Sequence, residues 1–93
     1  MIQSIVHKGL RLYFEKGNSA KLPAEYVAKI GFVLEALDAA STEADIKALG
    51  MGIHQLTGNY AGYWSLKISP NYRMVFRLEN GDVYDVDYLV FIN

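Results

Sequence analysis

The chain has 93 residues, enough for a single hydrophobic core, and we expect residues 1–93 to form one domain. The 9 Lys and Arg residues against 10 Asp and Glu give a net charge of −1, which excludes nucleic-acid binding through bulk positive charge alone. Without cysteine there are no disulfides and no thiolate metal sites. Residues 1–6 are too short for a signal-peptide core and no apolar run is long enough to span a membrane, so we expect a cytoplasmic protein.

The N-terminal segment predicts a short strand and a first helix. Residues 3–6 are apolar enough to form a strand that contributes to a core. Apolar residues then follow at helical spacing from Leu10 to Phe14, and Gly17 supplies a helix stop signal. A helix of this length is marginal alone, so it needs a surface to pack on.

A longer second helix is predicted to begin near Pro23 and to end at residues 39–41. Its apolar residues recur three and four positions apart, which gives a stripe wide enough to cover a sheet. Gly31 lowers the stability of this helix by roughly 1 kcal/mol relative to alanine, so we expect it to allow a close contact between helices. Residues 41–45 predict an N-cap for a further short turn that ends at Gly50.

Residues 54–89 carry a strict alternation of side chains. Even-numbered positions are apolar and odd-numbered positions are mostly polar or charged, as in antiparallel strands with one face on a core and the other in water. The even-numbered set, predicted to face the core, is Trp64, Leu66, Ile68, Tyr72, Met74, Phe76, Leu78, Tyr84, Val86 and Tyr88.

The turn near residue 80 sets the register of the last hairpin. A two-residue Asn-Gly loop would place an apolar residue opposite a charged one on the same face. We therefore predict a three-residue loop, Asn80-Gly81-Asp82, which pairs Leu78 with Tyr84 and places Arg77 opposite Asp85.

The preceding hairpin has a second three-residue loop at residues 69–71. This loop pairs Trp64 with Phe76 and Lys67 with Arg73. Two like charges side by side are mildly unfavourable unless they share an anion, which is a reason to look for a ligand at this position. The alternative is that the two long side chains splay apart.

These elements run in the order β-α-α-β-β-β-β. Such an order predicts an α+β fold with two layers, a largely antiparallel sheet with the helices on one face. Any chemistry that uses charged groups is then expected on the exposed face of the sheet or at its rim.

Three residues are candidates for chemistry. His54 can exchange a proton near neutral pH, and the alternative is a polar residue at a sheet rim. Arg73 can hold a phosphate in its planar fork, with an ordinary surface ion pair as the alternative. Lys67 beside Arg73 favours an anion site, whereas Asp85 and Asp87 would neutralise one. The two histidines and scattered acids predict no metal site.

Six further segments have a recognisable order and spacing. They are His7-Lys8-Gly9-Leu10, residues 34–40, His54-x-Leu56-x-Gly58, Gly62-Tyr63-Trp64-Ser65, Asn71-Tyr72-Arg73-x-x-Phe76 and residues 81–88. In these segments, which run nearly end to end, the chain resembles the HigB branch of the RelE/ParE toxin superfamily, the plasmid-maintenance killer protein type.

The resemblance implies a RelE-like sandwich and a toxin that enters the ribosomal A site and cuts mRNA there without a cofactor. It also implies a HigA-like helix-turn-helix antitoxin as partner, with operator DNA reached only through that antitoxin. His54 would be an acid–base or positioning residue, and Arg73 would stabilise charge on the scissile phosphate. The remaining contacts to RNA would come from Lys67, Arg77, Thr57 and Tyr60.

The chain departs from the family pattern at several positions. Thr57 stands where members of this branch carry lysine, Gly58-Asn59-Tyr60 replaces Gly-Asp-Arg, and the terminal Tyr-His becomes Phe91 and Ile92. Loss of one catalytic group typically lowers a rate by about 10²–10⁴-fold. An alternative function therefore stays open, a non-catalytic binding module that acts as the antitoxin's co-repressor or inhibits gyrase like ParE relatives. Residues 89–92 alternatively form a dimer or partner interface.

Overall fold

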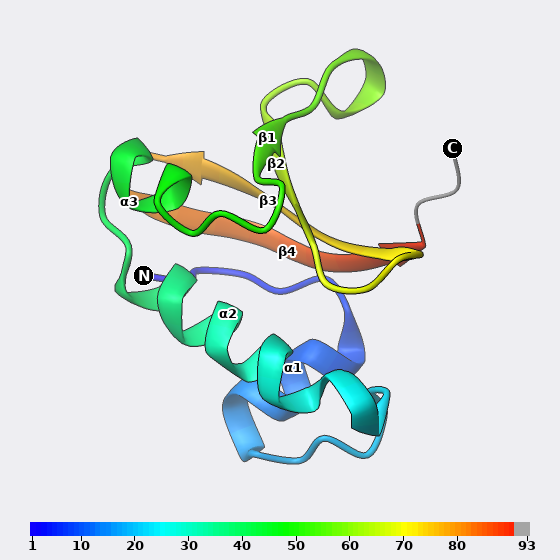
Figure 1. The fold of residues 1–93 in the computed structure, drawn as a ribbon. Coiled ribbons are helices and arrows are strands. Elements are labelled where there is room, and N and C mark those ends of the chain that lie inside the picture. Colours follow the sequence, from blue (N-terminus) through cyan, green and yellow to red (C-terminus); the bar gives the residue numbers. More distant parts are fainter. Residues whose placement is uncertain (91–93) are drawn as a thin grey trace.

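The computed structural model describes residues 1–90, in which α1 and α2 lie on one face of a four-stranded antiparallel sheet (Figure 1). The strand order is β1-β2-β3-β4, and the predicted α+β architecture of two layers is confirmed. None of the helices in this part of the chain has the length and apolar character needed to cross a membrane. The elements are α1 (Lys8–Lys16), a 3₁₀ turn (Ala24–Tyr26), α2 (Val27–Ala39), α3 (Glu43–Lys47), β1 (His54–Gln55), a second 3₁₀ turn (Gly58–Tyr60), β2 (Tyr63–Lys67), β3 (Tyr72–Glu79) and β4 (Asp82–Val90).

The helices α1 and α2 form as the sequence predicts. The His7 Nδ1 accepts a hydrogen bond from the Leu10 N–H at 3.1 Å, and Gly17 ends α1 with a left-handed φ of 71°. A Cβ built on Gly31 of α2 would come within 2.6 Å of the Tyr13 hydroxyl of α1, so the predicted close approach is confirmed. The buried residues of α2 are Ile30, Val33, Leu34 and Leu37.

A capping box holds the N-terminus of the short helix α3. The Thr42 hydroxyl accepts a hydrogen bond from the Asp45 N–H at 3.1 Å, and the Asp45 carboxylate accepts from the Ser41 and Thr42 N–H groups at 2.9 and 3.1 Å. These bonds, that from Ser41 first, lower the pKa of Asp45. The cap predicted at residues 41–45 is therefore confirmed.

The middle of the sheet has the predicted register. Trp64 pairs with Phe76 and Lys67 pairs with Arg73, as a three-residue loop at residues 69–71 requires. The side chains of β2 and β3 that face α1 and α2 form the centre of the core. The largest fully buried side chains are Phe76, Leu10, Ile30, Leu37, Ile46, Leu66, Ile68 and Met74.

The turn between β3 and β4 differs from the prediction. Asn80 and Gly81 alone form the loop, with φ values of 51° and 83° that are typical of a type I′ turn. Leu78 therefore pairs with Val83 and not with Tyr84. The predicted three-residue loop is wrong, and so is the prediction that Tyr84 faces the core.

A β-bulge at Asp85 restores the predicted alternation further along β4. On one side of the bulge Arg77 pairs with Tyr84, and on the other side Val75 pairs with Asp87, so β4 has one extra residue. Asp85 adopts a left-handed φ of 55°, which aspartate tolerates better than most residues. The alternation rule assumes equal residue numbers on paired strands, and the bulge breaks that assumption.

The N-terminal segment runs beside β4 (Figure 1) without forming a continuous strand in the described residues. Its contacts are two isolated parallel bridges, Ile2 to Val83 and Ile5 to Val86, one on each side of the bulge. The strand predicted at residues 3–6 is therefore wrong as an element, because the bulge interrupts the ladder that would have extended it.

Hydrogen bonds between Ser4 and Asp85 take the place of those that the bulge removes from the ladder. The Ser4 hydroxyl accepts from the Asp85 N–H at 2.8 Å and donates to the Asp85 Oδ1 at 3.1 Å. The Arg77 Nε donates to the other carboxylate oxygen of Asp85 at 3.0 Å. Asp85 is thus fixed from the N-terminal segment and from β3.

Substitution Ser4→Ala tests this arrangement. We expect the free energy of unfolding to fall by about 1–3 kcal/mol, because the Asp85 N–H loses its partner. Urea unfolding followed by circular dichroism measures the change. Ser19→Ala is the matched control, since Ser19 is a half-buried serine that accepts a hydrogen bond from the Leu22 N–H through its backbone carbonyl, which the substitution keeps. Equal losses in both variants would contradict the assignment.

Candidate functional site

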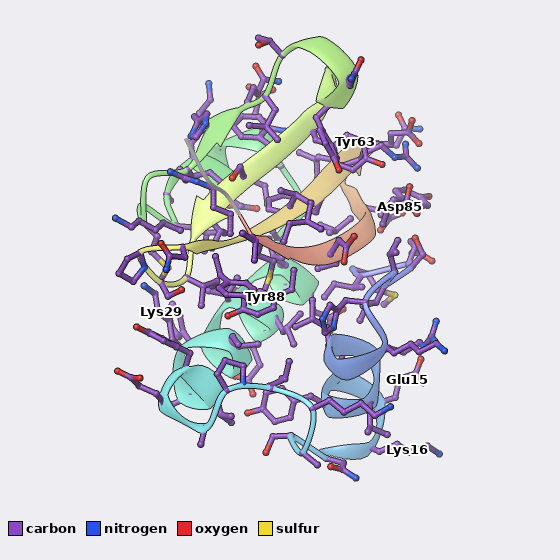
Figure 2. All side chains as sticks on the ribbon, turned by 90° about the vertical axis from the view of Figure 1, so that its right-hand side faces the viewer. Glu15, Lys16, Lys29, Tyr63, Asp85 and Tyr88 are labelled. Atoms are coloured by element: carbon purple, nitrogen blue, oxygen red, sulfur yellow. The ribbon has the colours of Figure 1, made fainter. Side chains whose placement is uncertain are left out.

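The sheet face that points away from α1 and α2, here called the outer face, carries the predicted site residues. Directly paired residues on neighbouring strands point to the same side, so the outer face consists of rows across the sheet. Tyr88, in contrast, points towards the helical layer (Figure 2). The three rows are Tyr63–Arg77–Tyr84, His54–Ser65–Val75–Asp87 and Lys67–Arg73–Leu89.

His54 is an exposed residue on the edge strand β1. Its Nδ1 lies 2.8 Å from the carbonyl oxygen of Gly52. Because a carbonyl oxygen can only accept a hydrogen bond, this contact favours the tautomer with the proton on Nδ1. The ring is therefore held in one orientation, and its Nε2 is left as a proton acceptor.

Lys67 and Arg73 are direct cross-strand neighbours in the row next to that of His54. Lys67 is exposed and Arg73 is half-buried. Since paired residues have Cβ atoms about 5 Å apart, two positive charges occupy one small area of the outer face. Arg73 lies two strands and one row from His54, roughly 12 Å between the backbones at the usual strand spacing and rise, a gap that the long arginine side chain can shorten.

Arg77 also lies on the outer face, but carboxylates already compensate its charge. Its Nε is 3.0 Å from the Asp85 carboxylate and its Nη1 is 3.0 Å from that of Glu79. The hydrogen bond that Arg77 donates to Asp85 raises the pKa of Arg77, and the negative charge of Glu79 adds to this effect. Arg77 thus stabilises the bulge and has less charge to offer a ligand than Lys67 has.

Thr57 and Tyr60 lie in the exposed loop between β1 and β2. The Tyr60 ring packs edge to face on Tyr63, with ring centroids 5.4 Å apart. Tyr84 lies in the same row as Tyr63, with its ring 5.3 Å from the Arg77 guanidinium. Sequence reasoning missed Tyr84 as an outer-face residue, because it predicts a three-residue loop, whereas the two-residue turn at residues 80–81 sets the orientation of Tyr84.

The centre of the outer face is buried, contrary to the prediction that odd-numbered residues contact water. Ser65 is 0% exposed and Val75 is 1% exposed. Both side chains are small and lie between rows of longer ones. The Ser65 hydroxyl is buried and makes no hydrogen bond with a described residue.

Asp87 completes the middle row on the far side of the sheet from His54. Its Oδ1 accepts a hydrogen bond from the Tyr88 N–H at 2.9 Å. Within residues 1–90, no group of three or more His, Asp or Glu side chains could hold a metal ion. The departures from the family pattern at Phe91 and Ile92 lie outside the described residues.

These positions give the outer face three distinct chemical parts. One end is aromatic, through Tyr60, Tyr63 and Tyr84, and the other end carries the cations Lys67 and Arg73. The Nε2 of His54, a proton acceptor, lies in the row between these two ends, on the edge strand β1. Single-stranded nucleic acids are bound by this combination, because bases stack on aromatic rings and phosphates contact cations.

Comparison with known sequences identifies two similarities over almost the whole chain. The sequence profile described as "RelE-like toxin of type II toxin-antitoxin system HigB" matches residues 3–89. The Endoribonuclease HigB of Proteus vulgaris is 40% identical over 88 residues, which cover 95% of this chain and 96% of that protein.

Two solved structures are similar in fold. The YoeB/ParE toxin from Agrobacterium tumefaciens has a TM-score of 0.57 at 19% identity, over 95% of this chain and 96% of that one. The YoeB-YefM complex from Staphylococcus aureus also has a TM-score of 0.57, at 21% identity, over 96% and 95% of the two chains. At these identities the similarity concerns the fold alone.

The ion pairs of Arg77 generate a prediction about the bulge. In a double-mutant cycle, Arg77→Met and Asp85→Asn should be clearly non-additive in the urea midpoint, because the two side chains share a direct hydrogen bond. The cycle of Arg77→Met with Glu79→Gln is the control and should be close to additive, since Glu79 is a more exposed partner. Equal coupling in the two cycles would contradict a special role for Asp85.

Proposed function

The chain belongs to the HigB-type, RelE-like toxins of type II toxin–antitoxin systems, and on this basis we propose that it is an endoribonuclease that cuts messenger RNA on the ribosome. The relative from Proteus vulgaris carries the name endoribonuclease. The observation that carries the proposal is the strand register, which brings His54, Lys67 and Arg73 onto one face of the sheet.

In the proposed reaction His54 acts as the general base. Its Nε2 accepts the proton of a ribose 2′-hydroxyl, and the 2′-oxygen forms a bond to the adjacent phosphorus. The bond from phosphorus to the 5′-oxygen of the next nucleotide breaks, and that oxygen takes a proton from water. The products are a 2′,3′-cyclic phosphate and a 5′-hydroxyl end. The hydrogen bond to Gly52 supports this role, since it keeps Nε2 unprotonated in the neutral ring.

Arg73 is proposed to stabilise the negative charge that develops on the phosphate oxygens. A guanidinium offers paired donors to such oxygens, and its half-buried position reduces competition from water. Lys67 is proposed to bind an adjacent phosphate. Thr57 and Tyr60 are proposed to contact RNA from the loop after β1, while Arg77 would contribute mainly by holding the bulge.

We also propose a helix-turn-helix antitoxin as the partner of this toxin, with operator DNA bound through the antitoxin. The family name places its members in toxin–antitoxin systems. One structure of similar fold is a YoeB-YefM complex, which is consistent with a RelE-like fold that binds a second protein.

A second candidate function is a non-catalytic member that acts only by binding. The observation that favours it is the set of replaced family residues, with Thr57 in place of lysine and Phe91 and Ile92 in place of Tyr-His. In this case the toxin would act as a co-repressor with its antitoxin or inhibit gyrase. Growth arrest with intact mRNA and altered DNA supercoiling would support the gyrase function.

Substitutions His54→Ala and Arg73→Ala test the proposed reaction. We expect cleavage of mRNA on programmed ribosomes to slow by about 10²–10⁴-fold for each variant, because each removes a group that acts in the transition state. Single-turnover cleavage with saturating toxin, followed by primer extension, measures the rate of the chemical step.

The controls for this experiment are matched in residue type or position. Gln55→Ala changes the neighbouring residue on β1, which pairs with the core residue Trp64. Arg11→Ala removes an arginine from α1. Both controls should cleave at the wild-type rate. Undiminished cleavage by the His54 and Arg73 variants would overturn the proposed mechanism, and no cleavage by the wild type would favour the binding function.

A further inference from the structure

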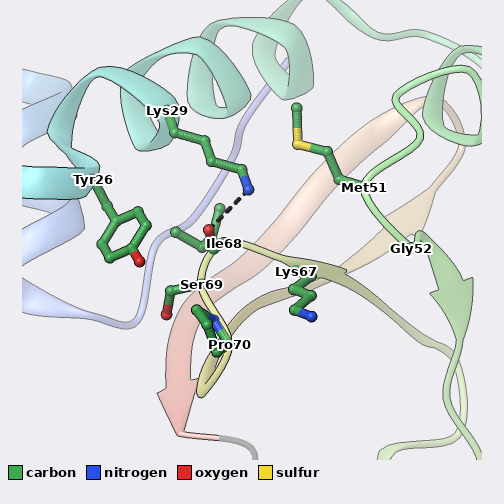
Figure 3. Close-up of a pocket in the computed structure, with 8 residues that line it drawn as sticks. All are labelled: Tyr26, Lys29, Met51, Gly52, Lys67, Ile68, Ser69 and Pro70. Atoms are coloured by element: carbon green, nitrogen blue, oxygen red, sulfur yellow. Dashed lines mark hydrogen bonds between the residues drawn. The ribbon is translucent and has the colours of Figure 1, made fainter.

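A second surface next to the outer face has the composition of a binding site. A groove of about 510 Å³ lies between the start of α2 and the turn from β2 to β3 (Figure 3). The residues that line it come from three separate parts of the chain. They are Tyr26, Lys29, Met51, Gly52, Lys67, Ile68, Ser69 and Pro70.

Lys29 is held at this groove by a backbone contact. Its Nζ donates a hydrogen bond to the carbonyl oxygen of Ile68 at 2.8 Å, as Figure 3 shows. An ammonium group has three donors, so two are left for a ligand. The side chain is half-buried, which places the charge at the groove and not free in solvent.

Lys67 brings a second positive charge to the same groove from β2. No carboxylate is among the residues that line the groove, and no described carboxylate forms an ion pair with Lys29 or Lys67. The groove is therefore locally positive although the chain has a net charge of −1. Its charge suits an anionic ligand.

The segment Met51-Gly52 connects this groove to the outer face. The Met51 carbonyl oxygen accepts a hydrogen bond from the Lys67 N–H at 2.8 Å, and the Gly52 carbonyl oxygen holds His54 at 2.8 Å. One dipeptide therefore positions both a cation of the groove and the proposed general base. Lys67 belongs both to the outer face and to the lining of the groove.

The backbone of this segment is strained in a way that agrees with a functional role. Gly50, Met51 and Gly52 have φ values of 70°, 55° and 68°, three left-handed residues in succession. A left-handed conformation costs a methionine roughly 1 kcal/mol or more, and such strain is most often found at functional sites. In this conformation the carbonyl oxygens of Met51 and Gly52 contact Lys67 and His54, and Met51 lines the groove.

We propose that this groove binds a phosphodiester of an RNA strand, contacted by Lys29 and Lys67, next to the cleavage site. The half-buried Tyr26 and the apolar Met51 and Pro70 supply surface for the attached nucleotide. This subsite rests on the proposed function for its RNA substrate, but its binding can be measured without any cleavage.

The test uses Lys29→Gln, which removes the charge but keeps a hydrogen-bond donor for the Ile68 carbonyl. Binding of a short fluorescein-labelled single-stranded oligoribonucleotide is measured by anisotropy over a range of salt concentrations. We expect affinity at low salt to fall about tenfold, the loss expected for one charge-assisted hydrogen bond. The slope of log affinity against log salt should become shallower by about 0.7, the value for one lost phosphate contact on a single strand.

Two control variants separate a specific subsite from general attraction. Lys29→Arg keeps the charge and should bind like the wild type. Lys16→Gln removes the same charge from the end of α1, far from Lys29 (Figure 2), and should also bind like the wild type. The proposal would be overturned if Lys16→Gln and Lys29→Gln lowered the affinity for the oligoribonucleotide equally, or if neither lowered it.

A second measurement identifies the source of the phosphodiester. Binding to ribosomes is compared with and without bound mRNA. If Lys29→Gln lowers the binding affinity only for ribosomes that carry mRNA, the groove binds mRNA. If the affinity for ribosomes without mRNA falls equally, the groove binds ribosomal RNA. The experiment separates failure of this proposal from failure of the proposed function. A wild-type protein that binds the oligoribonucleotide through Lys29 but cuts no mRNA would support the groove and contradict the proposed cleavage reaction.

Discussion

The β-bulge at Asp85 is the constraint on which the sheet depends. A type I′ turn at residues 80–81 fixes the start of β4 with Val83 in the core. Without an extra residue, this register would turn the hydrophobic residues of the rest of β4 towards the outer face. The bulge corrects the register, and its hydrogen bonds to Ser4 and Arg77 replace those lost from the ladder. It also attaches the N-terminal segment to the sheet.

The same bulge divides the cations of the outer face into two groups. Arg77, beside the bulge, is paired with Asp85 and Glu79, so its charge serves the structure. The row at the other end of the face contains Lys67, which forms no ion pair with a described carboxylate. Charge for a ligand is thus concentrated at the end of the sheet that adjoins the groove with Lys29.

The sequence predicts what depends on local patterns. Helix caps, the Gly31 contact and the Lys67–Arg73 pair all follow from residues close in sequence or from simple alternation. The bulge does not, because its hydrogen-bond partner Ser4 is 81 residues from Asp85. The sequence does not predict Lys29 as a site residue, because its partner is the backbone carbonyl of Ile68, and any residue at position 68 would offer the same carbonyl. The proposed roles of His54 and Arg73 come from the family resemblance. The strand register adds only that both residues lie on the same face of the sheet.

The distribution of acids explains how a chain with a net charge of −1 can present a locally positive surface. Several of its carboxylates are already engaged in local contacts away from the groove and from Lys67. These carboxylates belong to Glu43, Asp45, Glu79, Asp82 and Asp85. Charges more than about 8–10 Å apart are largely screened at physiological salt, so a ligand responds to the local field and not to the total charge. Near Lys29 and Lys67 that local field is positive, so the net charge of the whole chain does not describe the charge that a ligand meets at the groove.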